Sequence, residues 1–278
     1  MNFTSDNAGG VHPRIMAALS AANDGYVPSY GGDRITQAAQ ELLREVFDAP
    51  EAAIHFVPTG TAANALSLSL LTPCWGKVFC HQDAHIQTSE ANAPEFFTGG
   101  AKLVPVAGAA GRITAEGLAE ALFLHGRDAV HAGQNAALSL TNATEWGTVY
   151  DPDEVAALAG IARDHGLAVH MDGARFSNAL ASLDVAPADL TWRVGVDVLS
   201  LGATKNGCMA VEAVVIFDPA LSEELEFRRK RGGALVSKHR YLAAQMLAWL
   251  EGDLWLQMAS HANAMAHELA LGLARLPG

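Results

Sequence analysis

The sequence predicts an α/β fold in which a mostly parallel central sheet is flanked by helices. Short apolar runs alternate along the chain with stretches of helical periodicity, and this alternation is typical of a buried parallel sheet. A strand, a polar turn and a helix start also follow one another over residues 53–71. With 278 residues, the chain can bury a large core and suits one large domain, alone or with a smaller appendage.

The first elements follow from capping and spacing. Asp33 is placed to cap a helix over 34–47, in which Ile35, Leu42, Leu43 and Val46 have helical spacing. A strand is expected over 53–57, then a glycine-threonine turn that opens a helix over about 62–71. Further strands are expected over 78–80, 103–106, 137–140, 167–171 and 197–199.

The clearest helix start lies at Asp151, where Pro152 occupies the first turn and Glu154 can complete a capping box. This helix is expected to reach about His165 and to end at Gly166. From residue 219 onward the pattern becomes helical and amphipathic, which predicts packed helices at the C-terminal end.

Composition limits the classes of function. The formal net charge of −12 argues against a nucleic-acid partner, because phosphate binding calls for a basic surface. Cys74, Cys80 and Cys208 form no C-x-x-C pair and leave an odd count, which disfavours a disulfide framework or zinc ribbon. No export signal or charge-free membrane span is recognisable, so we expect a cytoplasmic protein that does not bind membranes.

Two segments carry the strongest chemical signal. Asp172 ends an apolar strand, and Lys205 follows in a polar, glycine-bearing turn. A pyridoxal phosphate enzyme needs this pair, since a buried carboxylate keeps the ring nitrogen protonated and a lysine amine holds the cofactor aldehyde. Taken singly, the aspartate is more often a turn or helix cap, and the lysine a solvated surface charge.

The order of motifs supports the chemical interpretation. The chain resembles the threonine aldolase branch of the β-eliminating lyase family, and in particular its bacterial low-specificity members, from near the N-terminus to about Gln245. The resemblance rests on Phe3-Thr4-Ser5-Asp6-Asn7, Tyr30-Gly31-Gly32-Asp33, Pro58-Thr59-Gly60-Thr61-Ala62-Ala63-Asn64, Asp83-Ala84-His85-Ile86, Asp172-Gly173-Ala174-Arg175 and Thr204-Lys205-Asn206-Gly207.

This resemblance implies an aspartate aminotransferase-like fold and a pyridoxal 5′-phosphate-dependent cleavage of L-threonine or L-allo-threonine to glycine and acetaldehyde. Another β-hydroxy amino acid, such as phenylserine, is an alternative substrate. The resemblance also implies a small C-terminal domain, which we expect to be shortened, so an inactive scaffold or fragment of the same fold is a further alternative. The resemblance also implies a homo-oligomer, a homotetramer above all.

The expected domains are an N-terminal arm and helix over 1–35, a large cofactor-binding α/β domain over 36–240, and the helical start of the shortened small domain over 241–278.

Several residues are expected to hold the cofactor. Thr59, Gly60 and Thr61 would present N–H groups and hydroxyls at a helix N-terminus, where an anion such as the cofactor phosphate is favoured, although a simple helix cap looks the same in sequence. The resemblance implies that His85 stacks on the pyridine ring. It also points to Arg231, in a basic run that otherwise suits a helix end, as a phosphate contact across a subunit boundary.

The base that takes the substrate proton is left open between two histidines. His85 follows a strand, and His131 precedes the turn Gly133-Gln134-Asn135, where family members place a second histidine near the substrate hydroxyl. Taken alone, His85 suits a core histidine and His131 a loop surface residue. The spacing of His81 and His85 would also suit two metal ligands, but no H-E-x-x-H helix or third ligand accompanies them, so no metal is expected.

Substrate contacts are expected from three residues. The planar guanidinium of Arg175 can grip a carboxylate with two parallel hydrogen bonds, and the resemblance adds Ser5 as its helper. Taken alone, Arg175 could pair with a helix end and Ser5 could be a helix cap. Tyr30 resembles a tyrosine that relatives contribute to the site, either from the same or from a neighbouring subunit.

Overall fold

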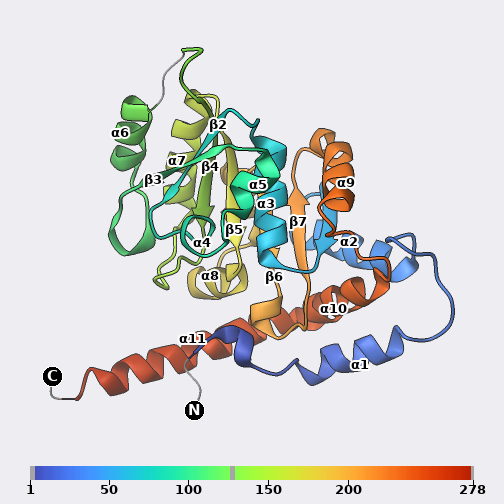
Figure 1. Ribbon diagram of the computed structural model, residues 1–278. Coiled ribbons are helices and arrows are strands. Elements are labelled where there is room, and N and C mark those ends of the chain that lie inside the picture. The colour runs from blue at the N-terminus through green and yellow to red at the C-terminus, as the bar shows by residue number, and fades with distance from the viewer. Residues whose placement is uncertain (1–3, 126–128, 277–278) are drawn as a thin grey trace.

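A single sheet organises the part of the chain that the computed structural model describes, residues 4–125 and 129–276. Its strands lie in the order β1-β7-β6-β5-β4-β2-β3, with helices on both faces (Figure 1). The strands are β1 (Ala53–Val57), β2 (Gly76–His81), β3 (Lys102–Val106), β4 (Gln134–Thr141), β5 (Ala168–Gly173), β6 (Val198–Gly202) and β7 (Glu212–Ile216).

The strand directions decide where a site can form. Strands β3, β2, β4, β5 and β6 run parallel, while β7 pairs antiparallel with both β6 and β1. Strand β1 therefore runs in the same direction as β6. Because the carboxyl ends of all these strands except β7 lie at one edge of the sheet, the loops that follow them gather there.

Helices cover the sheet in two layers. Buried side chains of α2, α7, α8 and α10 pack with one face of the strands, and those of α3 and α9 pack with the other. The helices are α1 (Pro13–Ala21), α2 (Arg34–Val46), α3 (Gly60–Leu71), α4 (His85–Thr88), α5 (Ala93–Thr98), α6 (Ala115–His125), α7 (Pro152–Asp164), α8 (Phe176–Leu183), α9 (Ser222–Arg231), α10 (Arg240–Leu250) and α11 (Leu254–Leu273).

The mostly parallel sheet flanked by helices confirms the predicted fold class. Each expected strand is present, although several extend by a few residues beyond their apolar runs. Helix α3 begins at Gly60, two residues before the expected start, because the Thr59 hydroxyl accepts a hydrogen bond from the Ala62 N–H and caps it. Strand β7 was not predicted, although all five of its residues are buried.

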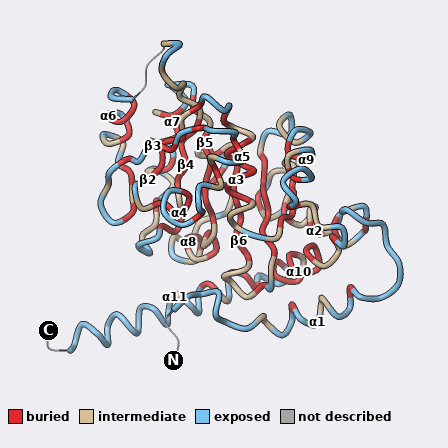
Figure 2. The backbone as a smooth tube through the Cα atoms, in the orientation of Figure 1, coloured by how far each residue is buried: buried red, intermediate tan, exposed pale blue. Residues whose placement is uncertain are grey.

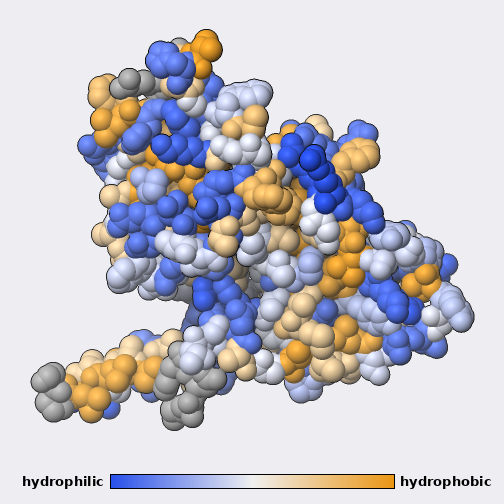
Figure 3. All heavy atoms as spheres, viewed as in Figure 1, coloured by the Kyte–Doolittle hydropathy of each residue, from blue (hydrophilic) through white to orange (hydrophobic). Residues whose placement is uncertain are grey.

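The C-terminal helices extend along one side of the molecule. Helix α10 packs against α1 and α2, and the first part of α11 packs against α8. The rest of α11 projects from the body (Figure 1) and is exposed along its length (Figure 2). Apolar side chains line this projection (Figure 3), including the exposed Leu269, Leu271 and Leu273. The domain boundaries at residues 35 and 240 stay predictions.

Within residues 4–125 and 129–276, no helix combines the length and apolar character that a membrane crossing requires.

Close backbone contact between β6 and the turn after β5 generates a testable prediction. A Cβ atom on Gly202 would lie 2.6 Å from the Ala174 Cα and 2.7 Å from the Ala174 carbonyl oxygen. Because backbone atoms cannot move aside cheaply, Gly202→Ala should lower the free energy of unfolding by about 1–3 kcal/mol in chemical denaturation. As a control, Gly160→Ala in helix α7 meets no atom within 4 Å and should leave stability unchanged or raise it. Equal stability of Gly202→Ala and the unmodified protein would contradict the analysis.

Candidate active site

A cavity of about 250 Å³ opens at the edge of the sheet where the parallel strands end. It collects residues from loops that are distant in sequence: the N-terminal segment, the β1–α3 turn, the start of α4 and the turns after β5 and β6. Its lining comprises Asn7, Pro58, Thr59, Gly60, Thr61, His85, Ala174, Thr204, Lys205 and Glu212.

Asp172 lies beside this cavity at the end of β5, paired in the sheet with Thr141 and Ser200. Only 3% of the residue is exposed. Its Oδ2 accepts a hydrogen bond from the Asn64 Nδ2 of α3 at 2.8 Å, and its Oδ1 accepts one from the Ala174 N–H at 3.0 Å. These donors hold the carboxylate at a defined position in a mostly apolar interior.

Lys205 occupies a short 3₁₀ turn, Thr204–Asn206, directly after β6. Strand β7 holds this turn in place, because the Glu212 Oε2 accepts a hydrogen bond from the Ala203 N–H at 2.6 Å. Burial raises the pKa of Glu212 to about 7, although hydrogen bonds from Thr204 and Ala203 and the charge of Lys205 act in the opposite direction. The carboxyl group of Glu212, with a pKa near neutral pH, therefore lies beside the turn that carries Lys205.

The N-terminus of α3 faces the same cavity through Thr59, Gly60 and Thr61. A Cβ atom on Gly60 would meet nothing within 4 Å, so this part of the turn is open. The unpaired N–H groups and the dipole of a helix N-terminus favour an anion. Thr59 also caps the helix, so the structure contains the alternative that the sequence left open, and the phosphate site stays a prediction.

His85 begins α4 and is held by two carboxylates. Its main-chain N–H donates to the Glu145 Oε1 at 2.7 Å, and its Nδ1 lies 2.7 Å from the Glu90 Oε1. The hydrogen bond to Glu90 is the main cause that raises the pKa of His85. Sequence reasoning missed Glu90, Glu145 and Glu212, because no local pattern reveals which carboxylates of a loop or strand the fold turns toward a site.

His81, whose spacing from His85 would also suit two metal ligands, forms hydrogen bonds with the nearby backbone. Its buried Nδ1 accepts a hydrogen bond from the Asp83 N–H at 3.1 Å, and its Nε2 lies 3.2 Å from the Gly108 carbonyl oxygen.

Arg175 is oriented by the N-terminal segment. Its Nε and Nη2 donate to the two oxygens of Asp6 at 2.7 and 3.2 Å. Ser5 caps the short turn that follows, since its hydroxyl accepts a hydrogen bond from the Asn7 N–H. Within the described residues, the Nη1 of Arg175 makes no hydrogen bond to the protein, so one edge of the guanidinium is available.

Within its own chain, the structure places His131 away from the other predicted catalytic residues, so a role as base would require the cavity of another subunit and stays a prediction. His131 precedes β4 at the amino-terminal edge of the sheet, in a surface depression with Trp75 and Gly133. Lys205 lies at the opposite edge. The eight residues of β4 span roughly 25 Å, which is too far for proton transfer within one chain.

Tyr30 and Arg231 also lie outside the cavity of their own chain. The Tyr30 ring is 4.7 Å from the Lys230 Nζ at the end of α9. Arg231 borders a separate depression with Phe96, Phe97 and Arg228. A role for either residue at the cofactor therefore requires the cavity of another subunit.

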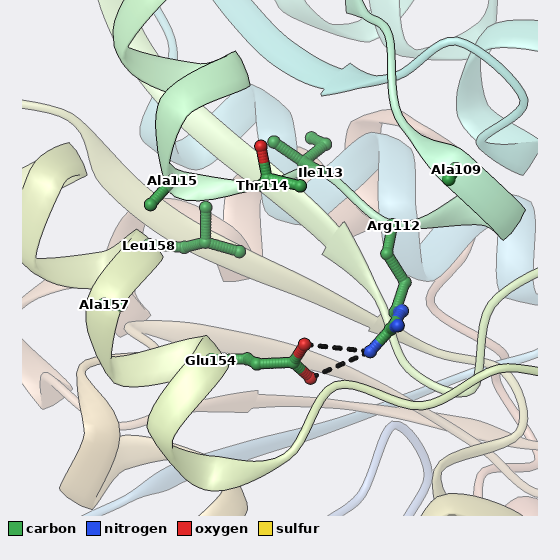
Figure 4. A pocket seen from close by; sticks show the side chains of 8 residues that line it. All are labelled: Ala109, Arg112, Ile113, Thr114, Ala115, Glu154, Ala157 and Leu158. Atoms are coloured by element: carbon green, nitrogen blue, oxygen red, sulfur yellow. Dashed lines mark hydrogen bonds and ion pairs between the residues drawn. The ribbon is translucent and has the colours of Figure 1, made fainter.

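Another cavity lies between residues 109–115 and α7 (Figure 4). Its charged side chains pair with each other, because the Arg112 Nη1 donates to both oxygens of Glu154 at 2.8 and 3.1 Å. Glu154 also completes the predicted capping box with Asp151. Both charges are thus accounted for by structural contacts, and we do not assign this cavity to catalysis.

The cavity at Lys205 and its immediate surroundings provide the parts required for binding pyridoxal phosphate: a lysine amine and a helix N-terminus for a phosphate in the lining, and beside it a buried carboxylate with its hydrogen-bond donors. On an α/β sheet, these parts define the class of pyridoxal phosphate-type enzymes. The chain belongs to the β-eliminating lyase family, which matches residues 2–278.

Relatives agree with this assignment. The chain is 42% identical to the low specificity L-threonine aldolase of Pseudomonas aeruginosa, over 99% of this chain and 79% of that protein. It is 31% identical to the Leishmania major threonine aldolase structure, with a TM-score of 0.92, over 98% of this chain and 78% of that one. A putative L-allo-threonine aldolase from Listeria monocytogenes, 16% identical with a TM-score of 0.72 over 92% of this chain and 69% of that one, shares the fold.

A polar layer beneath Asp172 generates a pH-dependent prediction. The His170 ring is fully buried, with Nδ1 2.9 Å from the Ser139 Oγ and Nε2 2.9 Å from the Ser200 Oγ. Burial lowers the pKa of His170 to about 4, against the opposing charge of Asp172. Between about pH 6.5 and 4 the unfolded chain binds the proton and the folded chain does not, so stability is complete above this range and falls as the pH drops through it.

The contribution of His170 to this loss should reach up to about 3 kcal/mol in denaturation series across this pH range. His170→Gln should flatten the pH dependence, while the same change at the exposed His165 should not. A slope that is identical in all three proteins would contradict the assignment.

Proposed function

We propose that this protein is a pyridoxal phosphate-dependent aldolase that cleaves L-threonine or L-allo-threonine to glycine and acetaldehyde. The observation that carries this proposal is that Lys205 and the α3 N-terminus line one cavity, and that Asp172 is hydrogen-bonded to Ala174 of its lining and to Asn64 of α3. The names of the relatives at 42% and 31% identity support the substrate. When bound, the cofactor supplies an electron sink for the pair released as the Cα–Cβ bond breaks.

Four elements would hold the cofactor. The Lys205 amine is the covalent attachment point, and Asp172 keeps the ring nitrogen protonated. Thr59, Gly60 and Thr61 bind the phosphate at the positive end of the α3 dipole. The remaining contact would be His85, which lines the cavity and whose imidazole would pack on the cofactor ring.

Arg175 would bind the substrate carboxylate. Asp6 occupies the Nε and Nη2 donors, and this side-on pairing fixes the plane of the guanidinium. The Nη1–Nη2 edge can then grip a second carboxylate in the bidentate geometry that arginine favours. By fixing the substrate carboxylate, Arg175 would set the orientation of the bonds at Cα and therefore which bond breaks, and Ser5 would assist it.

His85 is the base that the geometry supports. Its Nδ1 faces Glu90, so Nε2 is the nitrogen left to take the proton from the substrate β-hydroxyl. As that proton leaves, the oxygen forms the carbonyl of the aldehyde product and the Cα–Cβ bond opens. His85 can then return this proton to Cα of the substrate, which completes the glycine product.

Tyr30 and Arg231 support an oligomer in our proposal. Each would complete the site of a neighbouring subunit, Tyr30 toward the substrate and Arg231 toward the cofactor phosphate. A homotetramer in the cytoplasm is the assembly that we propose, and light scattering of the purified protein measures its mass.

Loss of the attachment point is the first test. Lys205→Ala should abolish both the visible absorption of lysine-bound cofactor and the formation of glycine from threonine, because no other described amine lines the cavity. Lys102→Ala, at an exposed position of edge strand β3, should retain both. Persistence of the absorption and of normal turnover in Lys205→Ala would refute the assignment.

Carboxylate recognition is the second test. Arg175→Lys keeps the charge but loses the planar fork, so KM for threonine should rise about tenfold or more. The visible absorption of bound cofactor should not change. Arg193→Lys, a substitution in a surface ion pair with Asp189, is the matched control. An unchanged KM in Arg175→Lys would assign the carboxylate to another residue.

Substrate choice separates the alternatives. Rates with L-threonine, L-allo-threonine and phenylserine distinguish a threonine aldolase from a phenylserine-type enzyme. Cofactor absorption without glycine formation from any of them would favour the inactive scaffold.

A further inference from the structure

A hydrogen-bonded chain of four side chains crosses the base of the active site. The Asn64 Nδ2 donates to the Asp172 Oδ2 at 2.8 Å and to the Glu90 Oε1 at 2.9 Å. The same Glu90 oxygen lies 2.7 Å from the His85 Nδ1. These hydrogen bonds connect Asp172 on β5, the proposed partner of the cofactor ring nitrogen, to His85 on α4, the proposed base. The side-chain amide of Asn64 on α3 is the link between them.

The burial of Glu90 is unusual for a carboxylate. Its side chain has no exposed surface, while that of His85 is 39% exposed. Its second oxygen, Oε2, makes no hydrogen bond. Within the described residues, no lysine or arginine pairs with it. A buried carboxylate of this kind is costly unless a neighbouring group carries positive charge, and the only such group bonded to it is the imidazole of His85.

We propose that Glu90 is a positioning residue for the reaction, which fixes the tautomer of His85 and stabilises its protonated form, and that Asn64 couples this pair to Asp172. This inference rests on the proposed function only in assigning His85 as the base. When the Nδ1–H group donates to Glu90, Nε2 carries the lone pair and can accept a proton from a group in the cavity.

The proton transfers of the proposed reaction are compatible with this pairing of His85 and Glu90. The substrate hydroxyl loses its proton to Nε2, and the resulting imidazolium remains paired with the carboxylate of Glu90. The buried negative charge is thereby compensated at the step when the base is charged. When His85 gives the proton up again, the pair returns to its starting state, so Glu90 itself exchanges no proton.

The groups around His85 act in both directions, and the hydrogen bond to Glu90 has the largest effect. Glu90 raises the pKa of His85 through the hydrogen bond and its charge, and Asp172 adds to this, while desolvation and Lys205 oppose it. Glu145 contacts His85 only through the main-chain N–H. Glu145 is therefore a suitable control for Glu90, because its carboxylate contacts the main chain of His85 but not the imidazole ring.

The test is an NMR titration of His85 in the purified full-length protein, with and without added pyridoxal phosphate. In Glu90→Gln the midpoint should move to lower pH, because the carboxylate that stabilises the imidazolium is gone. In Asn64→Ala it should move to higher pH, because Glu90 loses a competing donor and pairs more strongly with His85. Glu90→Asp should recover part of the Glu90→Gln shift, and Glu145→Gln should leave the midpoint near that of the unmodified protein.

Activity provides the second measurement. In Glu90→Gln, kcat for threonine cleavage should fall at least about tenfold, and the acid limb of kcat/KM should move to lower pH, while the cofactor absorption remains. A His85 midpoint that is the same in the unmodified protein, Glu90→Gln and Asn64→Ala would overturn the proposal. Shifted midpoints in a protein that cleaves no β-hydroxy amino acid would support the Glu90 assignment and reject the proposed aldolase function.

Discussion

One buried carboxylate, Asp172, constrains the rest of the site. Burying a carboxylate in an apolar interior is unfavourable unless donors are held against it. The donors here are the Ala174 N–H in the next turn of chain and the Asn64 amide on α3. Because Asn64 lies in the second turn of α3, its contact with Asp172 also fixes where the N-terminus of that helix points. The hydrogen bond between Asn64 and Asp172 therefore positions both the Asp172 carboxylate and the proposed phosphate site.

Small residues at the strand ends allow these groups to approach each other. A Cβ atom on Gly173 would lie 2.9 Å from the Ser200 carbonyl oxygen, and Gly202 meets the backbone of Ala174 still more closely. Side chains at either position would push β5 and β6 apart. Since Asp172 ends one strand and Lys205 follows the other, the spacing of acid and lysine depends on backbone contact rather than on any local feature of the lysine turn.

Three carboxylates contact the cationic side chains of the site or the turns that carry them, and they thereby orient these side chains. Asp6 orients Arg175, Glu90 pairs with His85, and Glu212 holds the turn that carries Lys205. Asp6 is far in sequence from Arg175, Glu90 lies in a loop without regular structure, and Glu212 begins strand β7, which returns beside the lysine turn. The net negative charge of the protein is thus partly placed where it orients functional cations, and the same cations reduce the cost of burying the acids.

The sequence by itself determined the strand and helix alternation, the caps at Asp33 and Asp151, and the pairing of Asp172 with Lys205, because capping, periodicity and residue chemistry act over a few neighbours or follow a recognisable motif. It did not reveal strand β7, the separation of His131 from Lys205, or the contacts of Glu90. Tertiary structure decided these, since strand direction places His131 at the opposite edge of the sheet, and only packing of α3 against β5 brings Asn64 between Glu90 and Asp172.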